Sequence, residues 1–210
     1  MRRYELRGLY VIIDPDVASG RDEVEVARQA LAGGARLIQL RDKRREKGVQ
    51  LPIARALRDL CQEHGALFIV NDHVDLALAV EAHGVHVGQK DLPVSVVRRL
   101  VPQEMIVGCS TNNPEEAGRA EADGADYVSV GRLFPTGSKA DTRPATTETV
   151  QAVKAAVSLP VCAIGGISDS NIDEVVAAGA DMAAVIAAVV AAPDVQEAAR
   201  RLAARFFAGS

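Results

Sequence analysis

The feature that most constrains the fold is a regular alternation of short apolar runs with longer amphipathic stretches. The short runs show no apolar–polar alternation, which is typical of parallel strands covered by helices. Eight of them are predicted strands: Leu9–Ile13, Leu37–Leu40, Leu67–Val70, Val85–Val87, Met105–Cys109, Tyr127–Val130, Val161–Ile164 and Met182–Ile186. The stretches between them include predicted helices at Asp22–Ala32, Gln50–Glu63, Asn113–Ala122, Thr147–Ala156 and Ser168–Ala178.

A recurring dipeptide supports a repeated structural unit. Gly-Ala stands before a predicted strand at residues 34, 65, 124 and 179, and Gly84-Val85 is a variant. Glycine there can adopt a positive φ and end a helix, so that a strand follows at once. The runs begin about 25 residues apart, the length of one βα unit, and no GxGxxG fingerprint follows the first run. We therefore expect one domain over residues 1–210, an α/β fold closed as a (β/α)₈ TIM barrel, rather than an open doubly wound sheet.

Composition narrows the class of function. With 48% hydrophobic and 25% charged residues, the chain is typical of a globular domain. A net charge of −4, no Trp, three Tyr and four Phe argue against nucleic-acid binding. The longest apolar run, residues 182–192, is too short to cross a membrane, and the charged N-terminus is unlike a signal peptide. The three cysteines are odd in number and far apart, so they predict neither a disulfide framework nor a metal cluster. Together these features lead us to expect a reduced, cytoplasmic enzyme without a membrane or nucleic-acid partner. The sequence allows a homo-oligomer but does not identify an interface.

Barrel enzymes carry their sites at the carboxyl ends of the strands, so the residues that follow each run are the candidates. The second run leads into the segment Gln39-Leu40-Arg41-Asp42-Lys43. Alternation directs Gln39, Arg41 and Lys43 to one side. Arg can bind a phosphate through two parallel hydrogen bonds and Lys adds a compact charge, so this end of the barrel is a candidate anion site.

Two carboxylates follow the third and fourth runs. Asn71-Asp72 ends the third run, and Asp91 comes shortly after the fourth. Each carboxylate alone could be a helix N-cap. Side by side on one face, they would form a pair of hard oxygen ligands suited to Mg²⁺. His86, in the fourth run, is more simply interpreted as an ordinary core histidine.

Hydroxyl groups follow the fifth and sixth runs. Ser110 is placed just after the fifth run, where it could donate to an anion, and no base is evidently paired with it. Asn112 or Asn113 is an expected helix N-cap before Pro114. The loop after the sixth run contains hydroxyls, open backbone N–H groups and a cation, which suit a phosphate, although a surface loop can have the same composition. Its members are Thr136, Gly137, Ser138 and Lys139.

The last two runs lead into a second candidate phosphate site. Gly165-Gly166 and Ile186-Ala187 stand where barrels often bind phosphate through backbone N–H groups. One monophosphate site and one pyrophosphate–Mg²⁺ site at the same mouth suggest alkyl transfer between two phosphorylated small molecules. Pyrophosphate would be the leaving group, stabilised by cations as its charge develops.

Six segments in this order resemble the thiamine-phosphate synthase family over nearly the whole chain. They are Gln39–Lys43, Asn71-Asp72, His86–Leu92, Gly108–Thr111, Phe134–Lys139 and Ile164–Ile167. The resemblance implies that a hydroxymethylpyrimidine pyrophosphate is joined to a thiazole phosphate, forming thiamine phosphate and releasing pyrophosphate. It also implies a dissociative substitution, in which pyrophosphate leaves before the thiazole nitrogen attacks.

Roles for individual residues follow from the same resemblance. The pyrimidine pyrophosphate would be held by Gln39, Leu40, Arg41, Asp42, Lys43, Asn71, Ser110 and Lys139. Within that set, catalysis would rest on Arg41, Lys43, Ser110 and Lys139. One Mg²⁺ per active site would be bound by Asp72 and Asp91. The thiazole phosphate would be bound by Thr136, Gly137, Ser138, Gly166, Ile186 and Ala187.

Three positions depart from the family pattern, and two alternative functions stay open. Asn112 replaces a common His, and Ser138 replaces a Thr but keeps the hydroxyl. Ala187 replaces a common Ser, and we expect the loss of that hydroxyl to weaken thiazole-phosphate binding. One alternative is a thiazole tautomerase-like paralogue, which uses a loop His for proton transfer; Asn112 argues against it. The other is a non-catalytic barrel that binds a phosphorylated ligand, and such a protein has no need of paired carboxylates.

Overall fold

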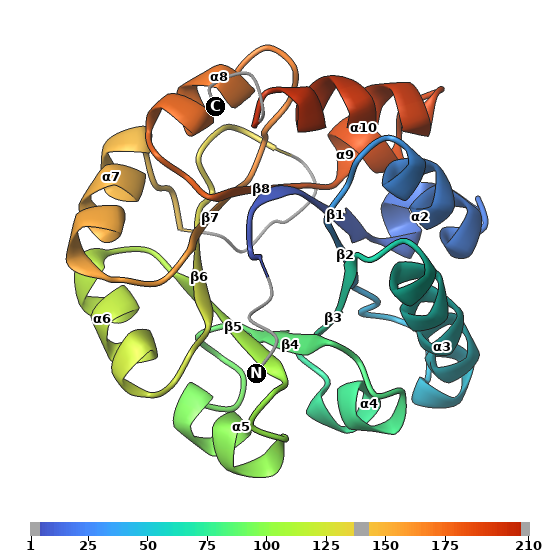
Figure 1. Cartoon of the computed structure of the whole chain (residues 1–210), viewed down its shortest axis with the longest axis horizontal. Helices are drawn as coiled ribbons and strands as arrows, with labels where there is room; N and C mark the ends of the chain where they lie inside the picture. The colour runs from blue at the N-terminus through green and yellow to red at the C-terminus, as the bar shows by residue number, and fades with distance from the viewer. Residues whose placement is uncertain (1–4, 137–142, 207–210) are drawn as a thin grey trace.

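Eight parallel strands form a closed barrel in chain order, with β8 paired back to β1. The computed structural model describes residues 5–136 and 143–206. Figure 1 looks down the barrel and shows the ring of strands inside a ring of helices. The strands are β1 (Gly8–Ile13), β2 (Leu37–Leu40), β3 (Leu67–Asn71), β4 (Gly84–Val87), β5 (Ile106–Thr111), β6 (Tyr127–Val130), β7 (Val161–Ile164) and β8 (Met182–Val185). The expected (β/α)₈ barrel is confirmed.

Helices lie on the outside of the barrel, between successive strands and, in the case of the last two, after β8 (Figure 1). They are α1 (Pro15–Ala18), α2 (Glu23–Ala32), α3 (Lys47–Glu63), α4 (Val74–Ala79), α5 (Val94–Leu100), α6 (Pro114–Ala122), α7 (Thr147–Ala156), α8 (Ile172–Ala177), α9 (Ala187–Val190) and α10 (Val195–Ala204). The predicted start of α8 at Ser168 is wrong. The Asn171 side chain accepts from the Ser168 N–H and donates to the Gly166 carbonyl, so these residues form a turn before the helix.

The strands are buried on both faces, which explains their unbroken apolar runs. In β1, Leu9, Val11 and Ile13 belong to the layer between strands and helices. Tyr10 and Ile12 belong to a second apolar cluster, which fills the inside of the barrel. Alternation along each strand therefore decides which side chains can reach the barrel mouth.

The barrel interior is filled so tightly that some strand positions need glycine. A Cβ atom at Gly108 would lie 2.2 Å from the Cζ atom of Tyr127. Tyr127 is fully buried, and its phenol ring takes the space that a β5 side chain would otherwise occupy. Gly108 thus allows one large polar side chain to lie across the barrel centre.

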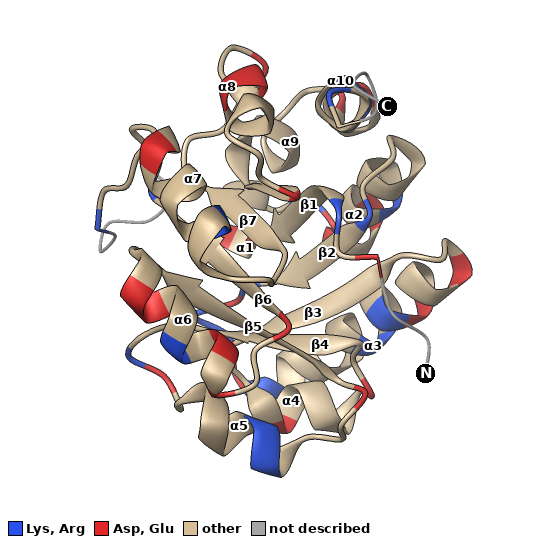
Figure 2. Ribbon diagram, turned by 60° about the vertical axis from the view of Figure 1, so that its left-hand side comes forward, with Lys and Arg blue, Asp and Glu red and all other residues tan. Residues whose placement is uncertain are grey.

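Charged residues lie on the outer helices, with basic residues on α5 and acidic residues on α8 (Figure 2). Within the described ranges, no helix is long and apolar enough to cross a membrane.

Candidate active site

A cavity of about 920 Å³ opens at the carboxyl ends of the strands. It extends from Tyr10 inside the barrel to the loops that follow the strands. Most of the candidate residues line this one cavity, although they come from seven different strand ends. They are Gln39, Arg41, Lys43, Asn71, Asp72, Asp91, Ser110, Thr136, Gly166, Ile186 and Ala187. The structure therefore brings together residues that are up to 148 positions apart in the chain.

Two members of the predicted pyrimidine set lie away from this cavity. Leu40 packs in the apolar layer between the strands and the helices. Asp42 is buried beside β2, where its carboxylate accepts the backbone N–H groups of Arg44 and Arg45 and pairs with the Arg45 guanidinium. Alternation turns both side chains away from the barrel mouth, and a part for these two residues in holding the ligand stays a prediction.

The loops after β6 and β7 pack closely at the far side of the cavity. Gly166 has φ +67°, and a Cβ atom there would lie 2.7 Å from the carbonyl oxygens of Phe134 and Pro135. Only glycine fits this approach, and both Gly166 and Thr136 line the cavity. Gly137, Ser138 and Lys139, which the sequence assigned to ligand binding, lie outside the described residues.

The cations at the cavity wall are held by acidic partners from neighbouring loops. The Arg41 guanidinium pairs with Asp14, a buried residue at the end of β1 that also accepts the Asp16 N–H. Lys43 Nζ lies 2.6 Å from Asp72 Oδ2. Asp14 is missing from the residues expected from the sequence. Its position directly after the first strand was the available signal, because every strand end borders the barrel mouth.

The two carboxylates expected at the metal site face the cavity and do not cap the helices that follow them. The residues in the N-cap positions of α4 and α5 are His73 and Pro93, and neither makes a side-chain capping bond. Asp72 adopts the left-handed region with φ 62°, which is uncommon outside glycine and turns its side chain toward Lys43. Asp91 accepts the Gly88 N–H at 2.7 Å.

The two carboxyl groups also interact directly with each other, and their pKa values move apart. Although burial alone would raise it, the hydrogen bond and charge of Lys43 lower the pKa of Asp72. Burial and the negative charge of Asp72 raise the pKa of Asp91, against the opposing effect of the Gly88 N–H. Paired oxygens of this kind fit Mg²⁺, which commonly takes one or two protein carboxylates and completes its shell with water and substrate phosphate. No group of three or more His, Cys, Asp or Glu side chains suited to a metal occurs among the residues described.

Ser110 has a histidine partner that the sequence did not predict. Strand β5 continues to Thr111, two residues beyond the expected end, so Ser110 lies within the strand and faces the cavity. His86 on the neighbouring β4 approaches Ser110 Oγ to 2.9 Å with its Nε2 atom. His86 is therefore a cavity residue and not only a core histidine. The lateral pairing of β4 and β5, which sets His86 opposite Gly108, is the cause.

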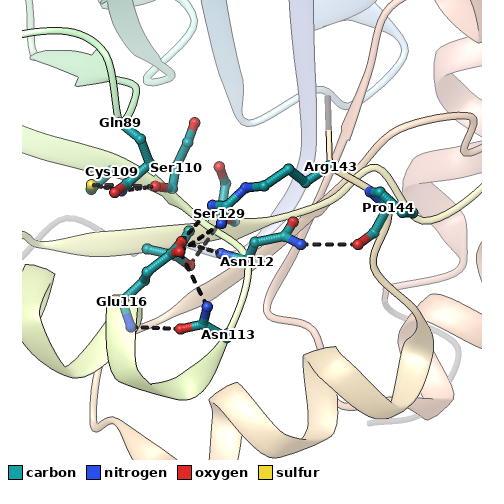
Figure 3. Close-up of polar contacts among 10 residues, drawn as sticks. Gln89, Cys109, Ser110, Asn112, Asn113, Glu116, Ser129, Arg143 and Pro144 are labelled. Atoms are coloured by element: carbon teal, nitrogen blue, oxygen red, sulfur yellow. Dashed lines mark hydrogen bonds and ion pairs between the residues drawn. The ribbon is translucent and has the colours of Figure 1, made fainter. Parts of the chain in front are cut away.

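A buried glutamate joins the start of α6 to the segment that leads into α7. Glu116 accepts from both terminal guanidinium nitrogens of Arg143 at 2.7 Å, and from the Asn112 backbone N–H and the Asn113 side chain (Figure 3). Asn113 is the N-cap of α6, as expected. The Asn112 side chain donates to the Pro144 carbonyl at 2.9 Å. Arg143 and Glu116 were missed because they are distant in the sequence.

Cys109, beside the cavity on β5, is unsuited to nucleophilic thiol chemistry. Cys109 follows Gly108 on β5 and is buried, and this burial raises the pKa of its thiol to about 11. The thiol therefore stays protonated at neutral pH, whereas the thiolate is the reactive form.

The sequence model described as thiamine monophosphate synthase matches residues 9–189. This chain belongs to the thiamine monophosphate synthase family. Relatives named thiamine-phosphate synthase include one from Methanospirillum hungatei, 49% identical over 197 residues, which are 93% of this chain and 96% of that protein. Another, from Moorella thermoacetica, is 50% identical over 195 residues, or 92% and 93% of the two chains.

Solved structures agree with this family assignment. Thiamine phosphate pyrophosphorylase from Pyrococcus furiosus is 40% identical and superposes with a TM-score of 0.89, covering 97% of this chain and 96% of that chain. Asn112 and Ala187 are two of the positions expected from the sequence to depart from the family pattern. Asn112 binds the backbone at Pro144, and Ala187 is the first residue of α9 on the cavity wall.

Proposed function

We propose that this chain is a thiamine-phosphate synthase that joins a pyrimidine pyrophosphate to a thiazole phosphate and releases pyrophosphate. Family membership supports the reaction. The observation that carries the site assignment is that one cavity has two chemically different sides. Arg41, Lys43 and the Asp72–Asp91 pair line one side, and the backbone around Gly166 and Ala187 lines the other. Two phosphorylated molecules can thus bind with their reacting ends facing each other.

Asp72 and Asp91 would hold one Mg²⁺ per site. When bound, this ion would neutralise charge on the pyrophosphate oxygens and make pyrophosphate a better leaving group. Arg41, fixed by Asp14, would bind the same group with its planar fork, and Lys43 would add a positive charge beside it. Gln39 and Asn71 lie deeper on this side of the cavity, where they would hold the pyrimidine, and Lys139 is proposed from the resemblance alone.

Catalysis would consist of positioning and stabilisation of the leaving group. The thiazole nitrogen is itself the nucleophile, so the protein has no need of an activated side chain. The barrel wall at Ile186 and Ala187 would hold the thiazole phosphate by its backbone. The thiazole would be set in line with the departing pyrophosphate.

A thiazole tautomerase-like activity is the alternative closest in chemistry. Such an enzyme needs a group that takes up and returns a proton, and the amide of Asn112 does not do so at neutral pH. Asn112 is also engaged with the Pro144 carbonyl. A barrel that only binds a phosphorylated ligand is the second alternative, and it would show no turnover that depends on Mg²⁺.

The test is pyrophosphate release by the purified chain, measured with each substrate alone and with both, in the presence and absence of Mg²⁺. We expect release only with both substrates and Mg²⁺. Asp91→Asn should lower the rate by about 100-fold or more, because it weakens the metal site. Asp75→Asn, an exposed change at the start of α4, is the matched control and should keep the rate. Absence of release with both substrates and Mg²⁺ would refute the proposal.

A further inference from the structure

A continuous chain of five polar side chains crosses the inside of the barrel. Gln39 Nε2 donates to the Tyr10 hydroxyl at 2.6 Å, and the Tyr10 and Tyr127 hydroxyls lie 3.1 Å apart. The Tyr127 hydroxyl is 2.9 Å from His86 Nδ1, and His86 Nε2 is 2.9 Å from Ser110 Oγ. All members but Ser110 are buried. Polar side chains at this depth need satisfied hydrogen bonds, so each hydroxyl proton along the chain requires an acceptor.

The order follows from counting protons. Each phenol has one proton, and burial raises the pKa of both Tyr10 and Tyr127, so both stay protonated. The Tyr10 hydroxyl accepts a hydrogen bond from Gln39, and it can then donate its own proton in a hydrogen bond to the Tyr127 oxygen. In the opposite arrangement, Tyr127 would donate to Tyr10 and the Tyr10 proton would have no acceptor in the chain, at a cost in free energy. The Tyr127 proton is therefore directed to His86 Nδ1.

We propose that Tyr10 and Tyr127 fix the imidazole proton of His86 on Nε2, so that His86 donates to Ser110 and the Ser110 hydroxyl proton is directed into the cavity. The tyrosines are positioning residues, since they act through His86. The ring geometry supports this role. The His86 and Tyr127 rings stack at 29° with centroids 5.5 Å apart, which holds the imidazole in place.

The direction of the chain decides what Ser110 can do. A Ser–His contact of 2.9 Å has the spacing of an activated nucleophile and its base. With Nε2 protonated, His86 cannot take the Ser110 proton, and Ser110 is a hydrogen-bond donor to the substrate. This consequence rests on the proposed function, under which an anionic pyrophosphate substrate lies in the cavity. The tautomer itself does not depend on that function.

Nuclear magnetic resonance of the whole chain with ¹⁵N-labelled histidine tests the tautomer directly. Long-range ¹H–¹⁵N correlations distinguish a protonated ring nitrogen from an acceptor nitrogen, and His86→Gln assigns the signal. We expect His86 to have Nε2 protonated and Nδ1 as acceptor. His83 is an internal reference, because its Nδ1 accepts the Phe68 backbone N–H at 3.0 Å. A protonated Nδ1 in His86 of the wild-type chain would overturn the proposal, whether or not the protein turns over substrate.

Tyr127→Phe removes the donor to His86 while keeping the ring. We expect a mixture of His86 tautomers with the His83 signal unchanged, and an increase of about 10-fold in KM for the pyrimidine pyrophosphate. If Tyr127 acts on the substrate through His86 and Ser110, the variant with both Tyr127→Phe and Ser110→Ala should have the same KM for the pyrimidine pyrophosphate as Ser110→Ala alone. Fully additive kinetic effects, or an unchanged His86 tautomer in Tyr127→Phe, would contradict the proposal. If Tyr127→Phe does not fold, the wild-type spectrum still decides.

Discussion

At the scale of single residues, the charges in the cavity are set by their partners as much as by their own identity. Arg41 has most of its side chain covered, and Asp14 fixes its guanidinium from the end of β1. The Lys43–Asp72 pair belongs to the same wall. A guanidinium held in this way loses less conformational freedom when it binds a phosphate, so Asp14 should act on affinity without touching the ligand.

Asp14→Asn tests this positioning. The asparagine oxygen can still accept the Asp16 N–H at the start of α1, but the charge that holds Arg41 is lost. We expect KM for the pyrimidine pyrophosphate to rise about 10-fold, with little change in the melting temperature. Asp16→Asn removes a pair with the exposed Arg44 instead and should leave KM unchanged. Equal KM values for Asp14→Asn and the wild type would show that Arg41 needs no such support.

Ala187→Ser tests the expected cost of a missing hydroxyl. Ala187 begins α9 at the cavity wall, so a serine there would add one donor beside the backbone N–H groups. KM for the thiazole phosphate should fall by about threefold to tenfold, corresponding to one additional hydrogen bond, while KM for the other substrate stays the same. Ala191→Ser, at the exposed far end of α9, is the matched control. A thiazole KM that does not fall in Ala187→Ser would place that phosphate elsewhere.

At the scale of elements, the start of α6 and the segment before α7 are joined by one buried carboxylate. Glu116 accepts four hydrogen bonds, two of them from Arg143. The Arg143 hydrogen bonds lower the pKa of Glu116, although burial raises it in part. A carboxylate with a lowered pKa in the folded state stabilises the fold above its unfolded pKa. That contribution is lost as the pH falls through the folded value.

Glu116→Gln should therefore destabilise the fold in a pH-dependent way. We expect the free energy of unfolding to fall by about 2 kcal/mol at pH 7. The difference from the wild type should shrink as the pH falls below the ordinary pKa of 4.5 and through the lowered pKa of folded Glu116, where the wild-type carboxylate becomes protonated. Denaturant unfolding at several pH values measures it, with Glu115→Gln on the exposed side of the same turn as control. A difference that does not vary with pH would rule out the charge as its source.

Gly108→Ala tests the packing of β5 against Tyr127. The new methyl group would overlap the buried phenol ring, so the ring has to move. The expected loss is about 2 kcal/mol in the free energy of unfolding, together with a disturbed His86 signal. Gly118→Ala, on α6 with no neighbouring atom within 4 Å of its Cβ position, should be neutral or slightly stabilising. Equal stability of the two variants would contradict the tight packing of the barrel centre.

At the scale of the whole molecule, the sequence predicted the barrel and one wall of the cavity, because both depend on short-range patterns. Alternation within residues 39–43 separates Gln39, Arg41 and Lys43 from Leu40 and Asp42. The contacts between strands could not be predicted in the same way. His86 meets Ser110 only because of the register of β4 and β5, and Arg143 meets Glu116 across 27 positions of the chain.

Net charge was also a weak guide to the ligand. The chain carries a formal charge of −4, and its outer helices have residues of both signs (Figure 2). The cavity instead gathers cations, including Arg41, Lys43, Arg132 and Arg143. A local cluster inside a low-dielectric cavity outweighs dispersed surface charges that are screened by salt. Two anionic substrates are therefore compatible with an acidic protein.

The most direct test of the joining reaction is the product balance of a single reaction mixture that contains both phosphorylated substrates and Mg²⁺. Chromatography with mass detection would follow thiamine phosphate and pyrophosphate over time. We expect the two products to form in equal amounts and neither to form when one substrate is left out. The absence of thiamine phosphate with both substrates and Mg²⁺ present would contradict the joining reaction proposed for this cavity.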